Sequence, residues 1–244
     1  MKKIANSIYF LLLMSVTNIA CNTLPERVVA AEAEKGAQLR KALIDKGLQL
    51  GKPIYFRAFK SEKILELYVQ DSMKQYILFH SYPICAASGA LGAKRREGDK
   101  QVPEGVYHIN RFNPKSDYHL SLGLDYPNPS DLRFCDATKP GGDIFIHGGC
   151  ASIGCLAMTD DAIKELYLLA QAAKEKGQID IPVHIFPFRN PPNTPEKSPE
   201  MSPEKSLENA NLWVSLLPIM TYFDAHKTLP NLVLGNDGYY KINS

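Results

Sequence analysis

The feature that most constrains the fold is a set of short segments with a period of two, starting near residue 54. Apolar and polar or aromatic side chains alternate over residues 54–59 and 65–70, and a third apolar run covers residues 76–82. Short polar turns, such as residues 60–63, separate these segments. Successive side chains of a strand point to opposite faces, so this pattern is typical of antiparallel β-strands. The sequence therefore predicts a scaffold of strands.

Two helices are expected beside these strands. Residues 31–48 carry apolar positions among charged ones at helical spacing, and Gly47 is a suitable stop. A second helix is expected to start at Thr159 or Asp160, either of which can cap it, and to end at Gly177.

The middle of the chain mixes strand and loop signals. Residues 86–104 are rich in Gly, Lys, Arg and Glu and are predicted to form a loop, after which strand character returns at 105–110. Residues 113–142 hold many Asn, Pro, Asp and Gly residues, which indicates a long irregular excursion; such excursions in compact domains are often functional. Residues 144–146 are predicted to be a short buried strand.

The C-terminal part is predicted to contain a last strand of the domain, a spacer and a segment that packs against the domain. Residues 181–186 read as a closing strand, and Pro182 indicates a sheet edge or a strand start. Residues 190–206 repeat Pro-Glu every four residues and cannot bury apolar surface, so we expect an extended or disordered spacer. Residues 207–244 contain aromatic side chains and are expected to pack back onto the domain.

The N-terminus is typical of an export signal. A basic start, Lys2 and Lys3, precedes an apolar run over residues 8–16, and this order disfavours the alternative of a buried core helix. The run is shorter than the roughly 20 apolar residues that a membrane-spanning helix needs. We predict a signal peptide over residues 1–20 and an N-terminal helical segment over residues 21–50.

The end of the signal leaves two possibilities open. Residues 18–21 (NIAC) resemble a lipoprotein signal, in which Cys21 would be acylated, but Asn18 stands where an aliphatic residue is usual. The same Asn18 is unfavourable for ordinary cleavage after Ala20. A lipid anchor at Cys21 is therefore the one membrane attachment that the sequence suggests. The net charge of +2 gives no electrostatic case for binding nucleic acid.

The cysteine count favours one free thiol. The five cysteines are Cys21, Cys85, Cys135, Cys150 and Cys155. In an oxidising compartment cysteines are usually paired. If Cys21 is removed or lipidated and one other is a nucleophile, three remain and cannot all pair within one chain. How Cys85, Cys135 and Cys150 pair is left open.

Cys155 and His147 are the candidate catalytic residues. A thiol attacks as a thiolate, and a nearby imidazole can take its proton. The helix that follows would favour the thiolate further through its positive dipole end. Gly154 would let backbone N–H groups reach a substrate oxyanion, Gly148 and Gly149 would leave an open floor beside the histidine, and Ser152 would brace the nucleophile loop by hydrogen bonding.

Spacing alone leaves other interpretations of this segment open. Cys155 could be a buried structural cysteine and His147 a structural histidine. His147, Cys150 and Cys155 could also ligate zinc, although the spacing matches no standard motif and a fourth ligand is not evident.

A family resemblance favours the catalytic interpretation. His147-Gly148 followed by Ser152-Ile153-Gly154-Cys155 resembles the signature of the L,D-transpeptidases, the YkuD-type domain. The resemblance is closest to the YafK-type branch and rests on these segments: 54–60, 82–106, 119–128, 144–160 and 181–189. It implies that residues 51–189 are the catalytic domain, with a mainly β fold: a small mixed β-sandwich or barrel-like sheet with a few helices. It also implies that Cys155 is the nucleophile and His147 the base, with no metal or organic cofactor.

The resemblance further implies an enzyme that acts on the bacterial cell wall, in the periplasm or cell envelope. Cys155 would attack a diaminopimelate-containing peptidoglycan stem peptide and form a thioester, which passes to an amine. Hydrolysis by the same mechanism, releasing an envelope lipoprotein from peptidoglycan, is the alternative. A non-catalytic peptidoglycan-binding lipoprotein is an alternative of another class. Two departures from the general family, Ile153 and Ala157, leave the choice between transfer and hydrolysis open.

A basic loop is the candidate substrate-binding segment. Lys94, Arg95, Arg96 and Lys100 could hold the carboxylates of a stem peptide. A solvated charged loop with no such role is the alternative.

Overall fold

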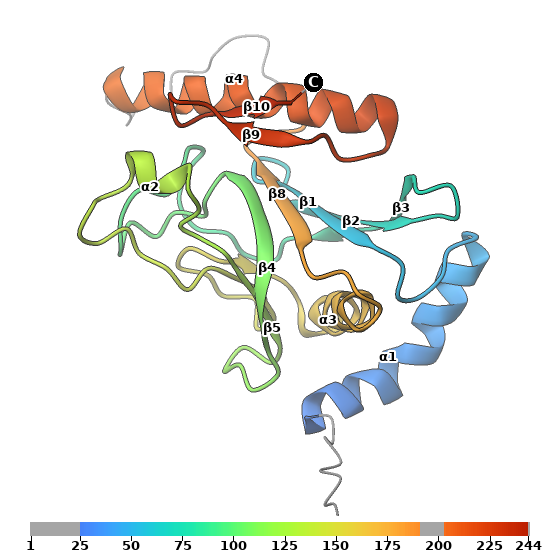
Figure 1. Cartoon of the computed structure of the whole chain (residues 1–244). Coiled ribbons are helices and arrows are strands. Elements are labelled where there is room, and N and C mark those ends of the chain that lie inside the picture. Colours follow the sequence, from blue (N-terminus) through green and yellow to red (C-terminus); the bar gives the residue numbers. More distant parts are fainter. Residues whose placement is uncertain (1–24, 191–202, 244) are drawn as a thin grey trace, which may run out of the picture.

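The computed structural model describes residues 25–190 and 203–243 (Figure 1). The predicted signal peptide, Cys21 and residues 191–202 of the predicted spacer lie outside the described residues. The helices are α1 Glu26–Asp45, α2 Asp131–Phe134, α3 Asp160–Glu175 and α4 Pro203–His226. The strands are β1 Ile54–Phe59, β2 Ile64–Gln70, β3 Tyr76–Pro83, β4 Gly105–Asn113, β5 Ser121–Leu124, β6 Phe145–His147, β7 Leu156–Ala157, β8 Ile181–Phe186, β9 Leu232–Leu234 and β10 Tyr240–Ile242.

Eight strands form one mixed sheet in the order β3-β2-β1-β8-β4-β5-β6-β7. The strands β1, β2 and β3 pair antiparallel, which confirms the strands expected from the period of two. The chain just after β3 pairs with β7 through an antiparallel bridge between Ala86 and Ala157. The two ends of the sheet therefore approach each other, and the fold is the mainly β, barrel-like sheet with a few helices that was expected.

Both faces of the central strands are buried, because helices cover each of them. On one face Phe56 and Ala58 of β1 share a core with α1 and α3. On the other face Phe59 packs with Phe186 and α4, while Tyr55 packs with Phe223 of α4 (Figure 1). This two-sided burial explains why aromatic side chains occupy the alternate positions of β1.

The helices differ from expectation mainly at their starts. The first helix begins at Glu26 rather than residue 31, because Val28 and Ala31 continue its buried face. The start of α3 is confirmed: Thr159 is its N-cap and accepts a hydrogen bond from the Ala162 amide. The fourth helix starts at Pro203, inside the segment expected to be a spacer. Among the helices that the structure describes, none is long and apolar enough to cross a membrane.

One expectation about the strands is wrong, and one that left two possibilities open is decided. The segment 113–142 is not irregular throughout, because it contains β5 and α2. All four residues of β5 are buried, so no alternation marks it. Of the two positions that Pro182 left open, the strand start is confirmed, because β8 lies between β1 and β4 and is not an edge. Pro182 stands at its start, before the pairing of β8 with β1 begins at Val183, so its missing N–H removes no bond to β1.

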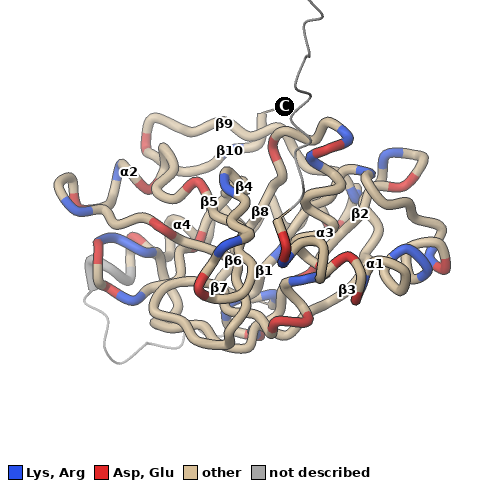
Figure 2. The backbone as a smooth tube through the Cα atoms, turned by 90° about the horizontal axis from the view of Figure 1, so that it is seen from below, with Lys and Arg blue, Asp and Glu red and all other residues tan. Residues whose placement is uncertain are grey.

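Charged residues of both signs are interspersed along the backbone. In the view from below, Lys and Arg positions alternate with Asp and Glu positions around the rim of the molecule (Figure 2). This distribution agrees with the small net charge of +2.

Candidate active site

Two neighbouring strands, β6 and β7, position His147 and the bend that carries Cys155. Strands β6 and β7 run parallel, with Ile146 opposite Leu156. Ile146 and Leu156 are fully buried in the core. His147 ends β6 and pairs with Ala157 of β7, and Cys155 lies in the bend immediately before β7, so the two candidate residues belong to neighbouring segments.

The His147 ring is held in a single tautomer. Its side chain is buried, and Nδ1 lies 2.6 Å from the Gly148 carbonyl oxygen. A carbonyl oxygen only accepts hydrogen bonds, so Nδ1 carries the proton and Nε2 keeps a lone pair in the neutral ring. Burial lowers the pKa of His147, and the bond to Gly148 opposes this only in part. A neutral imidazole with a free Nε2 can act as a base.

The two glycines after His147 allow close contacts rather than an open floor. The Gly148 amide donates to the Tyr118 carbonyl oxygen at 3.0 Å, and the Gly149 amide donates to an Asp160 carboxylate oxygen at 2.8 Å. A Cβ atom on Gly148 would lie 2.5 Å from that carboxylate. The expected open space is therefore filled by Asp160 and Tyr118.

The turn before Cys155 is organised by one hydroxyl group. Ser152 Oγ accepts from the amides of Gly154 (3.1 Å) and Cys155 (2.9 Å) and donates to the Cys155 carbonyl oxygen (2.7 Å). These are the bracing hydrogen bonds expected of Ser152. Gly154 has φ of +138°, a conformation that side-chain-bearing residues rarely adopt. The amides expected to form an oxyanion hole thus already have an acceptor in this state.

The thiol of Cys155 is protonated at rest. It donates to the Asp143 carbonyl oxygen, with Sγ 3.7 Å away. Burial raises the pKa of Cys155, and the nearby Phe145 backbone and the Lys94 ammonium oppose this only in part. The expectation that the following helix favours a thiolate is therefore wrong. That helix begins only at Asp160, and the Asp160 carboxylate occupies its first turn.

A disulfide between Cys85 and Cys150 ties the turn to the end of β3. Cys85 also donates its amide to the Ala157 carbonyl oxygen at 2.8 Å. Within the described residues the free cysteines are Cys135 and Cys155. Because Cys150 is in a disulfide, the zinc interpretation of His147, Cys150 and Cys155 is wrong. In residues 25–190 and 203–243 no group of three or more His, Cys, Asp or Glu side chains is arranged to hold a metal ion.

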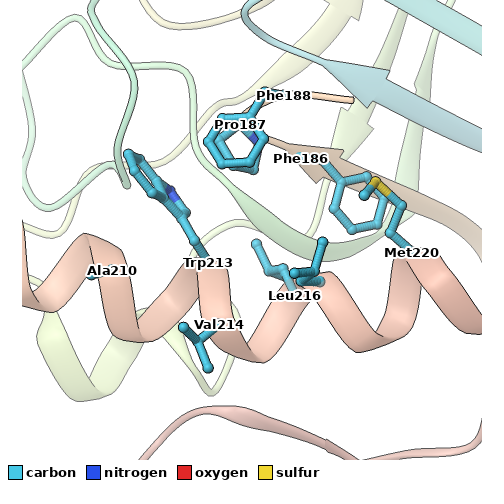
Figure 3. A pocket seen from close by; sticks show the side chains of 9 residues that line it. Phe186, Pro187, Phe188, Ala210, Trp213, Val214, Leu216 and Met220 are labelled. Atoms are coloured by element: carbon cyan, nitrogen blue, oxygen red, sulfur yellow. The ribbon is translucent and has the colours of Figure 1, made fainter. Parts of the chain in front are cut away.

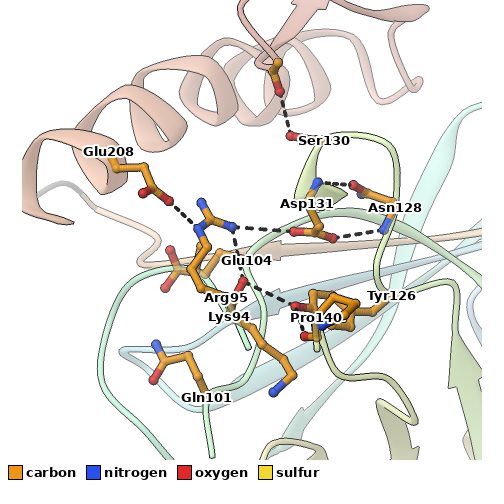
Figure 4. Close-up of polar contacts among 12 residues, drawn as sticks. Lys94, Arg95, Gln101, Glu104, Tyr126, Asn128, Ser130, Asp131, Pro140 and Glu208 are labelled. Atoms are coloured by element: carbon orange, nitrogen blue, oxygen red, sulfur yellow. Dashed lines mark hydrogen bonds and ion pairs between the residues drawn. The ribbon is translucent and has the colours of Figure 1, made fainter. Parts of the chain in front are cut away.

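The basic loop divides into paired and exposed cations. Arg95 pairs with Glu208 of α4 and lies 3.8 Å from Asp131 (Figure 4). Its charge is thus balanced within the protein, which argues against the predicted role of Arg95 in binding substrate. Lys94 is buried and pairs with Asp99 at 2.6 Å. The side chains of Arg96 and Lys100 are exposed, so these two remain candidates for contact with a substrate.

A hollow of about 230 Å³ lies on the other face of the sheet, between α4 and the end of β8. Trp213 and Leu216 of α4 face Phe186 and Pro187 across it (Figure 3). Its lining is almost entirely apolar and includes none of the predicted site residues. It is therefore separate from the site around Cys155.

Comparison with known proteins identifies the family. Residues 54–185 match the model of the L,D-transpeptidase catalytic domain, YkuD. The chain belongs to this family of L,D-transpeptidases. Proteins of Escherichia coli K12 and O157:H7 named "Putative L,D-transpeptidase YafK" are each 35% identical to it over 192 residues, which cover 78% of this chain and 74% of theirs.

Solved structures resemble this L,D-transpeptidase family member more distantly. The helical cell shape determining protein Pgp2 of Campylobacter jejuni is 22% identical, with a TM-score of 0.44 over 63% of this chain and 56% of Pgp2. Bd1075 of Bdellovibrio bacteriovorus is 25% identical, with a TM-score of 0.41 over 57% of this chain and 49% of Bd1075. This chain thus spans about half the length of these two solved chains.

Sequence reasoning did not find Tyr118 or Asp160 beside His147. Tyr118 lies in the segment expected to be irregular, and its ring centroid is 4.7 Å from that of His147. Asp160 was noted only as a helix cap. The one signal for these contacts was the pair of glycines after His147, since such pairs often mark a close approach of other groups.

Proposed function

We propose that this L,D-transpeptidase family member acts on diaminopimelate-containing stem peptides of peptidoglycan through a thioester on Cys155. One observation carries the proposal: His147 ends β6, Cys155 immediately precedes β7, the parallel neighbour of β6, and the imidazole is held through Nδ1 so that Nε2 keeps its lone pair. The export signal expected from the sequence supports a location in the periplasm for this reaction. Anchoring through an acylated Cys21 is compatible with it.

The reaction begins from a neutral pair. His147 Nε2 takes the thiol proton as Cys155 Sγ attacks the carbonyl carbon between diaminopimelate and the next residue. The C–N bond then breaks, and the leaving amine takes the proton from His147. In the second half-reaction an amine attacks the thioester carbonyl and His147 takes the proton of the amine. The C–S bond then breaks, and His147 returns that proton to the Cys155 sulfur, which restores the neutral pair.

The oxyanion would be stabilised at the turn before Cys155. The amides of Gly154 and Cys155 point at one acceptor, the Ser152 hydroxyl oxygen. A substrate oxyanion arriving there would share these two donors with Ser152. The Ser152 hydroxyl can keep its own bond to the Cys155 carbonyl oxygen, so the turn stays braced during the reaction.

Mass spectrometry of muropeptides tests this proposal. Sacculi carrying both stem cross-links and a bound lipoprotein are incubated with wild type, Cys155→Ala and Cys135→Ala, the last being the other described free thiol. New cross-links between diaminopimelate residues, or exchange of a terminal D-alanine, are expected with wild type and Cys135→Ala and not with Cys155→Ala.

Other outcomes distinguish the alternatives. Loss of lipoprotein remnants without new cross-links would identify a hydrolase that uses the same two residues. Binding without any turnover would identify a non-catalytic peptidoglycan-binding protein. Equal turnover by wild type and Cys155→Ala would refute the assignment of Cys155 as the nucleophile.

A further inference from the structure

The first helix lies outside the residues that match the family model, yet it reaches the candidate active site. The match covers residues 54–185, whereas α1 covers Glu26–Asp45. Arg27, in the first turn of α1, donates through one guanidinium nitrogen to the carbonyl oxygens of Ser116 and His119, the latter at 2.7 Å. A contact between α1 and the loop before β5 is therefore built into this chain.

The positive charge of Arg27 does not stabilise α1 itself. A cation in the first turn lies at the positive end of the helix dipole, where it is unfavourable. No side chain caps the helix at Pro25. The positive charge of Arg27 is instead directed at two carbonyl oxygens of another segment, which indicates that the contact serves that segment.

The loop that Arg27 holds carries Tyr118. The Tyr118 amide donates to Ser116 Oγ at 3.1 Å, and His119 has φ of +69°, so the loop is sharply folded. The Tyr118 carbonyl oxygen accepts the Gly148 amide. The Tyr118 ring lies against His147 at an interplanar angle of 40°, while 49% of the residue stays exposed.

The helix α1 is itself fixed to α3. Lys35 pairs with Asp161 at 3.2 Å, and Lys164 pairs with Glu34 at 2.6 Å. The start of α3 supplies Asp160, which binds the Gly149 amide. These ion pairs fix α1 against α3, and they therefore fix Arg27 relative to the loop beside His147.

We propose that Arg27 is a positioning residue, which holds the loop at residues 116–119 so that Tyr118 covers one face of His147. Covering this face keeps water from the imidazole and holds the ring in its orientation. This role rests on the proposed function, because it concerns the reaction proposed for Cys155 and His147. It makes the N-terminal helix part of the catalytic apparatus.

Two variants and a matched control test the proposal in the full chain. Arg27→Ala removes the contact, and Tyr118→Ala removes the ring. Arg40→Ala removes another α1 arginine, one that pairs with Glu32 on the same helix. We expect Arg27→Ala and Tyr118→Ala each to lower kcat on a stem-peptide donor about tenfold with KM changed less than about twofold, because both misplace the base. Arg40→Ala should leave both constants unchanged, and Arg27→Lys should restore part of kcat.

The double variant makes the test specific. If Arg27 acts only through Tyr118, the effects are not additive, and Arg27→Ala with Tyr118→Ala is no slower than the slower single variant. Additive effects, or an unchanged kcat in Arg27→Ala, would overturn the proposal. If Arg27→Ala does not fold, as judged by thermal unfolding, Arg27→Lys and Tyr118→Leu are combined in the same cycle.

A second readout does not depend on activity. Titratable groups near His147 are Tyr118 on the loop, Cys155 on the turn and Asp160 at the start of α3, where the carboxylate is bound to Gly149. In an NMR titration, with His147→Gln used for assignment, uncovering the ring should move the His147 pKa up toward the ordinary value in Arg27→Ala and not in Arg40→Ala. No movement in Arg27→Ala contradicts the positioning role even if turnover is never detected, so its failure is distinct from that of the proposed function.

Discussion

Removing the disulfide between Cys85 and Cys150 should lower the free energy of unfolding by about 4 kcal/mol. The disulfide joins residues separated by 65 positions, with Cα atoms 5.3 Å apart. In the chain-entropy account, closing a loop of that size in the unfolded state is worth about 4 kcal/mol at room temperature. The perturbation is the double substitution Cys85→Ala with Cys150→Ala, which leaves Cys135 and Cys155 in place.

Urea unfolding followed by the fluorescence of Trp213, the single tryptophan, measures this loss. The double variant should unfold at lower urea and with a steeper dependence on urea, since an uncrosslinked unfolded chain exposes more surface. Reduced wild type should match the double variant, and Cys135→Ala should match oxidised wild type. A loss below about 1 kcal/mol, or an equal loss in Cys135→Ala, would refute the reasoning.

Three further predictions concern protons and a helix cap. The rate of thioester formation should fall as pH drops through the lowered pKa of His147, because protonation removes the base; an acid limb at or above the ordinary histidine pKa of about 6.5 would contradict this. Burial lowers the pKa of His184 from 6.5 to about 3, so this residue stabilises the fold above pH 6.5 and the stability is lost as pH falls toward 3. Between about pH 7 and about pH 5, the free energy of unfolding of wild type should therefore fall by about 2 kcal/mol more than that of His184→Gln. Chemical unfolding at the two pH values measures both. Thr159→Ala should cost about 1 kcal/mol in the same assay, since it removes the cap of α3, while a change at the exposed Thr138 should not.

Local patterns predicted most of the secondary structure. The period of two identified β1, β2 and β3, and the capping signal at Thr159 identified the start of α3. These features depend on neighbours in the sequence, which is why they can be read from it. The position of β8 could not be read, because Pro182 indicates only that one backbone donor is missing and not which strands lie on either side.

The candidate site was predicted in part. The strand before His147 and the turn before Cys155 could be placed from local signals, and Ser152 makes the expected hydrogen bonds. The raised pKa of the Cys155 thiol was not predicted, since it comes mainly from burial, and burial depends on the whole fold. The contact of Arg27 with Ser116 spans 89 residues, so no local pattern could reveal it.

The parallel pairing of β1 with β8 has a consequence for when the protein can fold. Phe56 pairs with Val183, about 130 residues later, and β8 also joins β1 to β4. Until β8 is available, the chain holds two half-sheets, each with an unpaired inner edge that another chain could bind. Such distant pairing makes folding slow. A chain that emerges N-terminus first during synthesis therefore completes its sheet only after nearly all of the domain has emerged, and a chaperone that covers the edge of β1 until then would reduce aggregation.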